Sequence, residues 1–166
     1  AGFRNAQVTD PSLAANREWA RATHEVTASD EAAPETWPTS ADAVVMIRHG
    51  HGEWEALAAA ERALVLERAA HHLEARRSDL IVAARPLGVA FADADRDVTT
   101  AVDFARYYAA TVRELDAVSG AIFVAPGITV VAGSDADLIA SADEGALAPL
   151  AAGGAAILVA RPHEQR

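Results

Sequence analysis

The sequence contains no cysteine, which excludes disulfides, thiolate nucleophiles and zinc sites built on cysteine. Lysine is also absent, because all 14 basic residues are arginine. Chemistry that needs a deprotonatable amine, such as Schiff-base formation, is therefore excluded from this chain. No Gly-x-Gly-x-x-Gly phosphate loop occurs either, so the ordinary dinucleotide fingerprint is missing.

Long apolar runs are missing as well. None approaches the ~20 residues that a membrane-spanning helix needs, and no basic and apolar N-terminal segment indicates export. The formal net charge of −10 would repel nucleic acid and anionic membrane surfaces. We therefore expect a cytoplasmic protein with neither kind of partner.

The length of 166 residues favours one domain, residues 1–166. A chain of this size buries roughly 68–70% of its unfolded surface, which is enough for a core. Hydrophobic residues make up 51% of the chain, but alanine dominates them, so much of this content is small-residue helix surface. Residues 1–118 read as mainly helical and residues 119–166 as strand–helix–strand.

In the first part, Asp10-Pro11 predicts a helix start, because aspartate caps helices and proline suits the first turn. Residues 28–40 read as a linker rich in proline and acidic residues. A short apolar helix is expected over Ala41–Arg48, and the His49–Gly52 segment is expected to break it.

The strongest helical pattern covers Trp54 to Ala84, and the segment Arg85–Gly88 is expected to end it. A second helix is expected from Val98 to Leu115. Its buried side is formed by Val98, Val102, Ala105, Tyr108 or Ala109, Val112 and Leu115. Three carboxylates, Asp93, Asp95 and Asp97, would then stand at the positive end of this helix.

From Ser119 the pattern changes to that of a parallel sheet. Short strands are expected at Ala121–Ala125 and Ile128–Ala132, on either side of Pro126-Gly127. A helix over Leu138–Ala152 and a strand over Ala155–Ala160 follow. The fold class is therefore α/β, with N-terminal helices leading into the start of a Rossmann-like parallel sheet.

Several segments, taken in order, carry a family resemblance. They are Phe3-Arg4-Asn5, Asn16 to Ala20, Trp54 with Glu61-Arg62, Ala101 to Tyr108, Pro126 to Val131, and Leu150 to Gln165. Together they resemble the N-terminal part of the aldehyde dehydrogenase superfamily. They are most similar to the 1-pyrroline-5-carboxylate dehydrogenase or degenerate dehydrogenase-like domain of proline utilization A. The resemblance implies an incomplete aldehyde-dehydrogenase-like fold, proline catabolism, and oligomeric assembly.

The chain departs from the family pattern where the resemblance implies chemistry. The family asparagine that stabilises an oxyanion falls on Ala136, flanked by Asp135 and Asp137. A family lysine that contacts the cofactor ribose corresponds to Arg161, and a Gly-Lys pair becomes Gly88-Val89. The nucleophilic cysteine and the general-base glutamate of the family are not on this chain. No catalytic residue and no bound cofactor are therefore predicted.

The residues that resemblance and context leave as cofactor contacts are Arg161, Pro162 and Gly153. Each also has a simpler interpretation. Arg161 can be a strand-end residue in solvent or in a salt bridge, and Gly153 with Gly154 can be a helix C-cap and tight turn.

Other clusters of polar or aromatic side chains also have simpler interpretations. Metal binding by His49, His51 and Glu53 competes with a solvated turn, and the His71-His72 pair cannot chelate because adjacent helical residues point about 100° apart. A calcium loop at Asp93 fails because Val98 and Phe104 occupy its glycine and glutamate positions. Acid–base work by Ser134, Asp135 and Asp137 competes with an ordinary turn, and Tyr107-Tyr108 with helix packing. No metal site is predicted.

The sequence leaves three alternative hypotheses for the function of this chain. The first is a non-catalytic aldehyde-dehydrogenase-like module that supports assembly or intermediate channelling in a bifunctional proline catabolic enzyme. Its partners would be other domains or subunits of a dehydrogenase assembly. The second is the N-terminal fragment of an active NAD-dependent dehydrogenase. The third is a helical interaction protein that presents residues 61–84 and 98–115 to a partner.

Overall fold

A computed structural model describes residues 3–27, 38–115, 117–132 and 140–159. Its elements are α1 (Ala14–Glu25), α2 (Ser40–Glu55), α3 (Ala59–Ala75), α4 (Arg77–Ala84), a 3₁₀ turn η1 (Arg85–Leu87), α5 (Phe91–Leu115), β1 (Ile128–Ala132), α6 (Ala140–Ala151) and β2 (Ala155–Val159). Helices therefore precede a β–α–β unit, as the sequence predicts. Within the described residues, no helix is both long enough and apolar enough to cross a bilayer.

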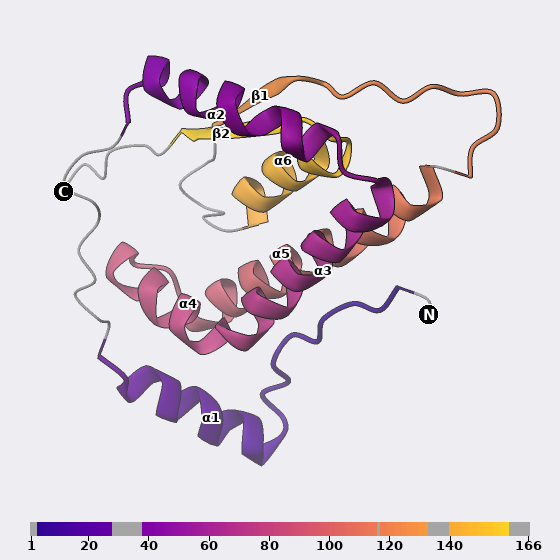
Figure 1. Ribbon diagram of the computed structural model, residues 1–166. Coiled ribbons are helices and arrows are strands. Elements are labelled where there is room, and N and C mark those ends of the chain that lie inside the picture. The colour runs from indigo at the N-terminus through magenta and orange to yellow at the C-terminus, as the bar shows by residue number, and fades with distance from the viewer. Residues whose placement is uncertain (1–2, 28–37, 116, 133–139, 160–166) are drawn as a thin grey trace.

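The two strands pair in parallel, and Ile128 is aligned with Ala155 and Ala132 with Val159. Figure 1 shows the strands between α2 and α6, with α6 lying between the sheet and the neighbouring antiparallel helices α3 and α5. Leu147 and Ala151 of α6 belong to the same buried cluster as Leu66 of α3 and Val102 of α5. The sheet is therefore fixed to the helical part through α6.

Helix α5 confirms the predicted apolar face. Val98, Val102, Ala105 and Val112 are buried, and Ala109 rather than Tyr108 takes the remaining position. The start of this helix corrects the prediction, because α5 begins at Phe91 and includes all three aspartates. Asp93 still lies in the first turn, at the positive end of the helix dipole, but Asp95 lies inside the core and is not part of a charged entrance.

Helix α2 corrects a second prediction. It runs from Ser40 to Glu55, straight through the His49–Gly52 segment that was expected to break it. Thr39 and Asp42 cap its first turn reciprocally, and the two glycines cost only about 1 kcal/mol each in a helix. The capped first turn and, near the other end of α2, a hydrogen bond from the Trp54 indole to the carbonyl of Leu150 offset that cost.

The predicted helix over Trp54–Ala84 is divided among three elements. Trp54 belongs to α2, and the backbone of Arg76 leaves helical geometry between α3 and α4, with φ −97° and ψ 15°. Glu61 caps α3 by accepting a hydrogen bond from the backbone N–H of Ala58 at 2.9 Å. The predicted end is confirmed, because η1 closes on Gly88 with φ +78°.

Helix α1 begins at Ala14, later than Asp10-Pro11 suggested. Asp10 instead closes the preceding turn, since its Oδ1 accepts a hydrogen bond from the N–H of Ser12 at 2.8 Å. Most of the predicted linker, residues 28–37, lies outside the described residues.

The predicted strand over Ala121–Ala125 is absent, because residues 121–127 form an extended connection without regular structure. Ile122, Phe123 and Val124 are exposed there, and no described strand pairs with them. High β-propensity alone does not form a strand when no neighbouring edge accepts its hydrogen bonds. The strands at Ile128–Ala132 and from Ala155 are confirmed, and Ala160 lies outside the described residues.

Candidate functional site

The carboxyl ends of β1 and β2 meet at one edge of the sheet, after Ala132 and Val159. In open parallel sheets ligands bind outside this edge, which makes it the candidate site of the fold. The residues that the sequence singles out there, Ser134 to Leu138 with Arg161 and Pro162, lie outside the described residues.

Gly153 and Gly154 lie at the opposite edge, where α6 turns into β2. Gly153 adopts φ +86°, and its N–H donates to the carbonyl of Leu150 at 3.0 Å. The N–H of Gly154 donates to the carbonyl of Pro149 at 2.7 Å. These two bonds form a Schellman motif, in which Gly153 adopts the left-handed conformation. The cofactor contact of Gly153 stays a prediction, and the structure gives this residue a place in the turn.

Two side chains from distant helices complete this helix end. The indole Nε1 of Trp54 donates to the carbonyl of Leu150 at 3.0 Å, and Nε of Arg62 donates to the carbonyl of Ala151 at 3.1 Å. Arg62 also donates to the carbonyl of Leu57. A guanidinium at the negative end of α6 is favourable for the helix dipole. Sequence reasoning missed both roles, because the carbonyls that Trp54 and Arg62 bind lie 96 and 89 residues further along the chain.

Close backbone approach holds α6 and β2 against β1. A Cβ added at Gly145 would lie 2.4 Å from Cγ1 of Val131. A Cβ added at Gly154 would lie 2.8 Å from Cγ of Pro126 and 2.9 Å from the carbonyl oxygen of Gly127. Only glycine fits at these two contacts, so the geometry of the sheet edge depends on them.

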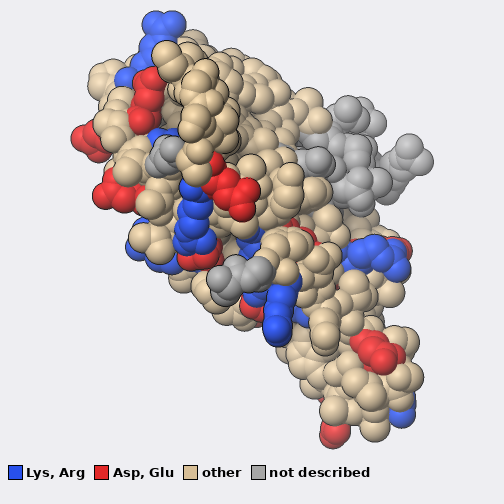
Figure 2. All heavy atoms as spheres, turned by 90° about the vertical axis from the view of Figure 1, so that its right-hand side faces the viewer, with Lys and Arg blue, Asp and Glu red and all other residues tan. Residues whose placement is uncertain are grey.

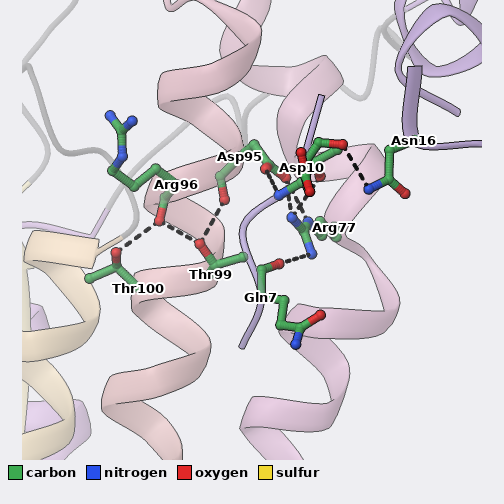
Figure 3. A network of polar contacts seen from close by, with 9 residues as sticks. Gln7, Asp10, Asn16, Arg77, Asp95, Arg96, Thr99 and Thr100 are labelled. Carbon is green, nitrogen blue, oxygen red and sulfur yellow. Dashed lines mark hydrogen bonds and ion pairs between the residues drawn. The ribbon is translucent and has the colours of Figure 1, made fainter. Parts of the chain in front are cut away.

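A second polar cluster joins the N-terminal segment to the helices (Figure 3). Nε of Arg77 donates to Oδ1 of Asp95 at 2.7 Å, and Nη1 donates to the carbonyl of Gln7 at 3.0 Å. The other carboxylate oxygen of Asp95 accepts from the N–H of Thr9 at 2.8 Å. The Arg77 guanidinium also lies 5.6 Å from the centre of the Trp19 ring.

Asp95 was predicted as part of a charged helix entrance, but it is only 1% exposed. The signal that would have placed it is its spacing, because Asp95 stands three residues before Val98 on the apolar face of α5. A carboxylate on such a face needs a cationic partner, and Arg77 supplies it.

The histidine clusters do not form a metal centre. His49 lies within α2, where Nδ1 contacts the carbonyl of Val45 at 2.9 Å. His51 pairs with Glu55 at 3.6 Å. No group of three or more metal-ligating side chains is present among the residues the structure describes.

Tyr107 and Tyr108 pack together with ring centres 5.4 Å apart, and Tyr107 lies 6.3 Å from Phe3. Their predicted role in packing fits this arrangement.

One face of the molecule (Figure 2) shows acidic and basic side chains interspersed among uncharged ones.

A helical layer that leads into a parallel β–α–β unit is typical of α/β proteins with a Rossmann-like sheet. The model of the aldehyde dehydrogenase family matches residues 17–131. The chain belongs to this family, as the resemblance in its sequence implied. No curated protein matches the chain.

Among solved structures, proline utilization A (PutA) from Corynebacterium freiburgense is 35% identical with a TM-score of 0.71, over 93% of this chain and 16% of that chain. A variant of PutA from Bradyrhizobium japonicum is 25% identical with a TM-score of 0.79, over 94% of this chain and 17% of that chain.

A variant of 1-pyrroline-5-carboxylate dehydrogenase from Thermus thermophilus is 16% identical with a TM-score of 0.79, over 95% of this chain and 39% of that chain. This last similarity concerns the fold alone. The chain therefore spans a small part of the PutA chains and well under half of the Thermus enzyme.

Proposed function

We propose that this chain is a non-catalytic aldehyde-dehydrogenase-like module of a bifunctional proline catabolic enzyme, where it supports assembly or intermediate channelling. Membership of the aldehyde dehydrogenase family and similarity to PutA and 1-pyrroline-5-carboxylate dehydrogenase chains support the choice of this class of enzyme. A fold alone does not carry a function, so the proposal rests on the site.

The observation that carries the proposal is a contrast between scaffold and chemistry. The β–α–β unit is closely packed, with Gly145 against Val131, Gly154 against Gly127, and side-chain caps on the end of α6. The sequence nevertheless has Ala136 where the family resemblance places an oxyanion-stabilising asparagine, and Arg161 where it places a lysine. Alanine has no side-chain donor, so this stabilisation is lost.

Apolar exposure supports a module that packs against another part of a dehydrogenase assembly. Ile122 and Val124 on the connection to β1 are 93% and 81% exposed, and Val130 on β1 is 64% exposed. Such side chains on neighbouring segments are typical of a surface that a partner covers. The partner that we propose is the working dehydrogenase domain, because the PutA chains are several times longer than this one.

We also propose that residues 1–166 form one domain, that no cofactor binds to it, and that Arg161, Pro162 and Gly153 are at most remnants of a cofactor site. The shared core of Leu66, Val102, Leu147 and Ala151 supports one domain, because it joins the helical part to the β–α–β unit.

Calorimetric titration with NAD tests the proposal. We expect no saturable heat for the wild-type chain. The double variant Ala136→Asn with Arg161→Lys should also give none if a complete NAD site needs residues beyond those of this chain. Tight, saturable NAD binding to the wild-type chain would contradict the non-catalytic function.

The second candidate is the N-terminal part of an active NAD-dependent dehydrogenase. Its support is the similarity to 39% of the Thermus 1-pyrroline-5-carboxylate dehydrogenase chain. The sequence that follows Arg166 in the gene discriminates between the two candidates. A cysteine and a glutamate in a continuing Rossmann-like unit, with aldehyde oxidation by the full protein, would favour this second function.

In that full protein, Ala136→Asn should then raise the rate by about 10²–10³, the value of one oxyanion donor. An unchanged rate would indicate that Ala136 does not occupy the oxyanion position.

A further inference from the structure

A hollow of about 810 Å³ lies between the N-terminal segment and the helices α3 and α5. We call residues 3–7 of that segment the strap. The strap lines one side of the hollow, and side chains from α3, α4 and α5 line the others. Its volume falls in the range of about 300–1,000 Å³ that is usual for small-molecule sites.

Two ion pairs between α3 and α5 flank the hollow. Arg113 donates to Glu67 at 2.7 Å, and Arg106 donates to Glu74 at 2.6 Å. Seven residues separate the pairs along each helix, which is a distance of about 10 Å. Ala70, His71 and Ala110 lie between them in sequence and also line the hollow, and the two alanines leave space beside the imidazole.

The strap is held in place by the helices that it crosses. The N–H of Ala6 donates to Oδ1 of Asp103 on α5, and the carbonyl of Gln7 accepts from Arg77 on α4. The wall that the strap contributes is therefore tied at two points. Arg4 of the strap faces the hollow with no ion pair or hydrogen bond to any residue in the described part of the chain.

The lining carries an excess of positive charge. Four arginines and two glutamates line the hollow, and three of the arginines are paired: Arg77 with Asp95, Arg106 with Glu74 and Arg113 with Glu67. The excess positive charge of the lining is therefore that of Arg4. The whole chain has a net charge of −10, so this sign is local. Each guanidinium has five N–H donors, and Arg106 and Arg113 each use one of them on a glutamate.

We propose that the hollow binds a small organic anion that carries a carboxylate or a phosphate group. The anion would lie over Ala70 and Ala110, between the two ion pairs, and would accept hydrogen bonds from the spare N–H groups of Arg106 and Arg113. Arg4 would supply the unpaired positive charge. The planar fork of arginine suits both anionic groups.

Screening of charge by salt favours a small ligand over a large polyanion at this site. At physiological salt, interactions beyond about 8 Å are largely screened, so a bound small anion feels the local arginines. A large polyanion such as nucleic acid would lie along the wider acidic surface and be repelled. This site is separate from the sheet edge, and the inference does not depend on the proposed function.

The test is a titration of the 166-residue chain with glutarate and with inorganic phosphate, followed by amide shifts in NMR spectra. We expect saturable shifts at Ala70, His71 and Ala110 with at least one of the two anions. The response to each anion separates a carboxylate ligand from a phosphate ligand.

A charge-matched pair of double variants makes the test specific. Glu74→Gln with Arg106→Gln removes one flanking ion pair, and binding should weaken about tenfold or more, because a charge-assisted hydrogen bond is lost. Asp93→Asn with Arg96→Gln removes an exposed ion pair on the same helix and should leave binding unchanged. The single variant Arg4→Gln alters no described contact and should weaken binding several-fold.

No saturable shift with either anion would overturn the proposal, as would equal binding by the wild-type chain and by Arg4→Gln. Because Arg4 is exposed and pairs with no residue that the structure describes, its replacement keeps the test valid even if the double variant at Glu74 and Arg106 fails to fold.

Discussion

Arg77 of α4 and Asp95 of α5 form an ion pair inside the protein, with Nε of the arginine 2.7 Å from Oδ1 of the aspartate. Asp95 is almost fully buried, while the Arg77 side chain is 20% exposed. The same pair also binds the backbone of Gln7 and Thr9, so one charge pair joins two helices to the N-terminal segment.

The first prediction follows from this burial. Arg77→Met should destabilise the chain by about 3 kcal/mol or more, because it leaves a buried carboxylate without its partner. Urea denaturation followed by circular dichroism measures the loss. Arg76→Met is the control, since Arg76 is adjacent and forms only an exposed pair with Asp79; it should cost about 0.5 kcal/mol or less. Similar losses in the two variants would contradict the buried pair.

The glycines give a second prediction, with opposite signs at two positions in helices. Gly145→Ala in α6 should destabilise the chain, because the added Cβ would lie 2.4 Å from Cγ1 of Val131. Gly50→Ala in α2 meets nothing within 4 Å and should stabilise the chain by about 0.5–1 kcal/mol through helix propensity. Thermal melting of both variants gives the comparison. Stabilisation by Gly145→Ala would mean that α6 does not approach β1 so closely.

Much of the β–α–β unit could be predicted from sequence, because its turn signals are local. Pro126-Gly127 precedes β1 and Gly153-Gly154 precedes β2, and the apolar run that follows each pair has strand length. The backbone conformation of Gly153 is of the kind that glycine supplies most easily, so the residue itself indicates the turn.

What sequence reasoning missed depends on contacts between distant residues. The His49–Gly52 segment resembles a helix breaker, yet α2 continues through it. Trp54 and Arg62 cap a helix whose carbonyls lie about 90 residues further on, as the sequence separations of 96 and 89 show. A local pattern contains no information about such partners, and tertiary contacts override propensity there.

The third prediction concerns the cap that Trp54 provides. Trp54→Phe removes the indole N–H that donates to the carbonyl of Leu150, and should cost about 0.5–1.5 kcal/mol. Hydrogen exchange at Gly153 and Gly154 should become faster, because the end of α6 loosens. Tyr107→Phe is the control, since it removes a polar atom from an exposed aromatic ring on α5, far from this helix end in sequence. Unchanged exchange at both glycines would show that the cap does not hold the turn.

The fourth prediction is a pH dependence at the ion pair of Glu67 and Arg113. The hydrogen bond from Arg113 lowers the pKa of Glu67 below its ordinary value of 4.5. A carboxyl whose pKa is lower in the folded state stabilises the protein above its unfolded pKa, and this contribution is lost as the pH falls through the folded value. The stability gap between the wild-type chain and Glu67→Gln should therefore be full at pH 6 and should shrink below about pH 4.5. Because both side chains are about 40% exposed, the gap should be about 1 kcal/mol or less and should narrow further in 1 M salt. Urea denaturation at a series of pH values measures the gap, and a gap that stays constant down to pH 3 would contradict the hydrogen bond between Glu67 and Arg113.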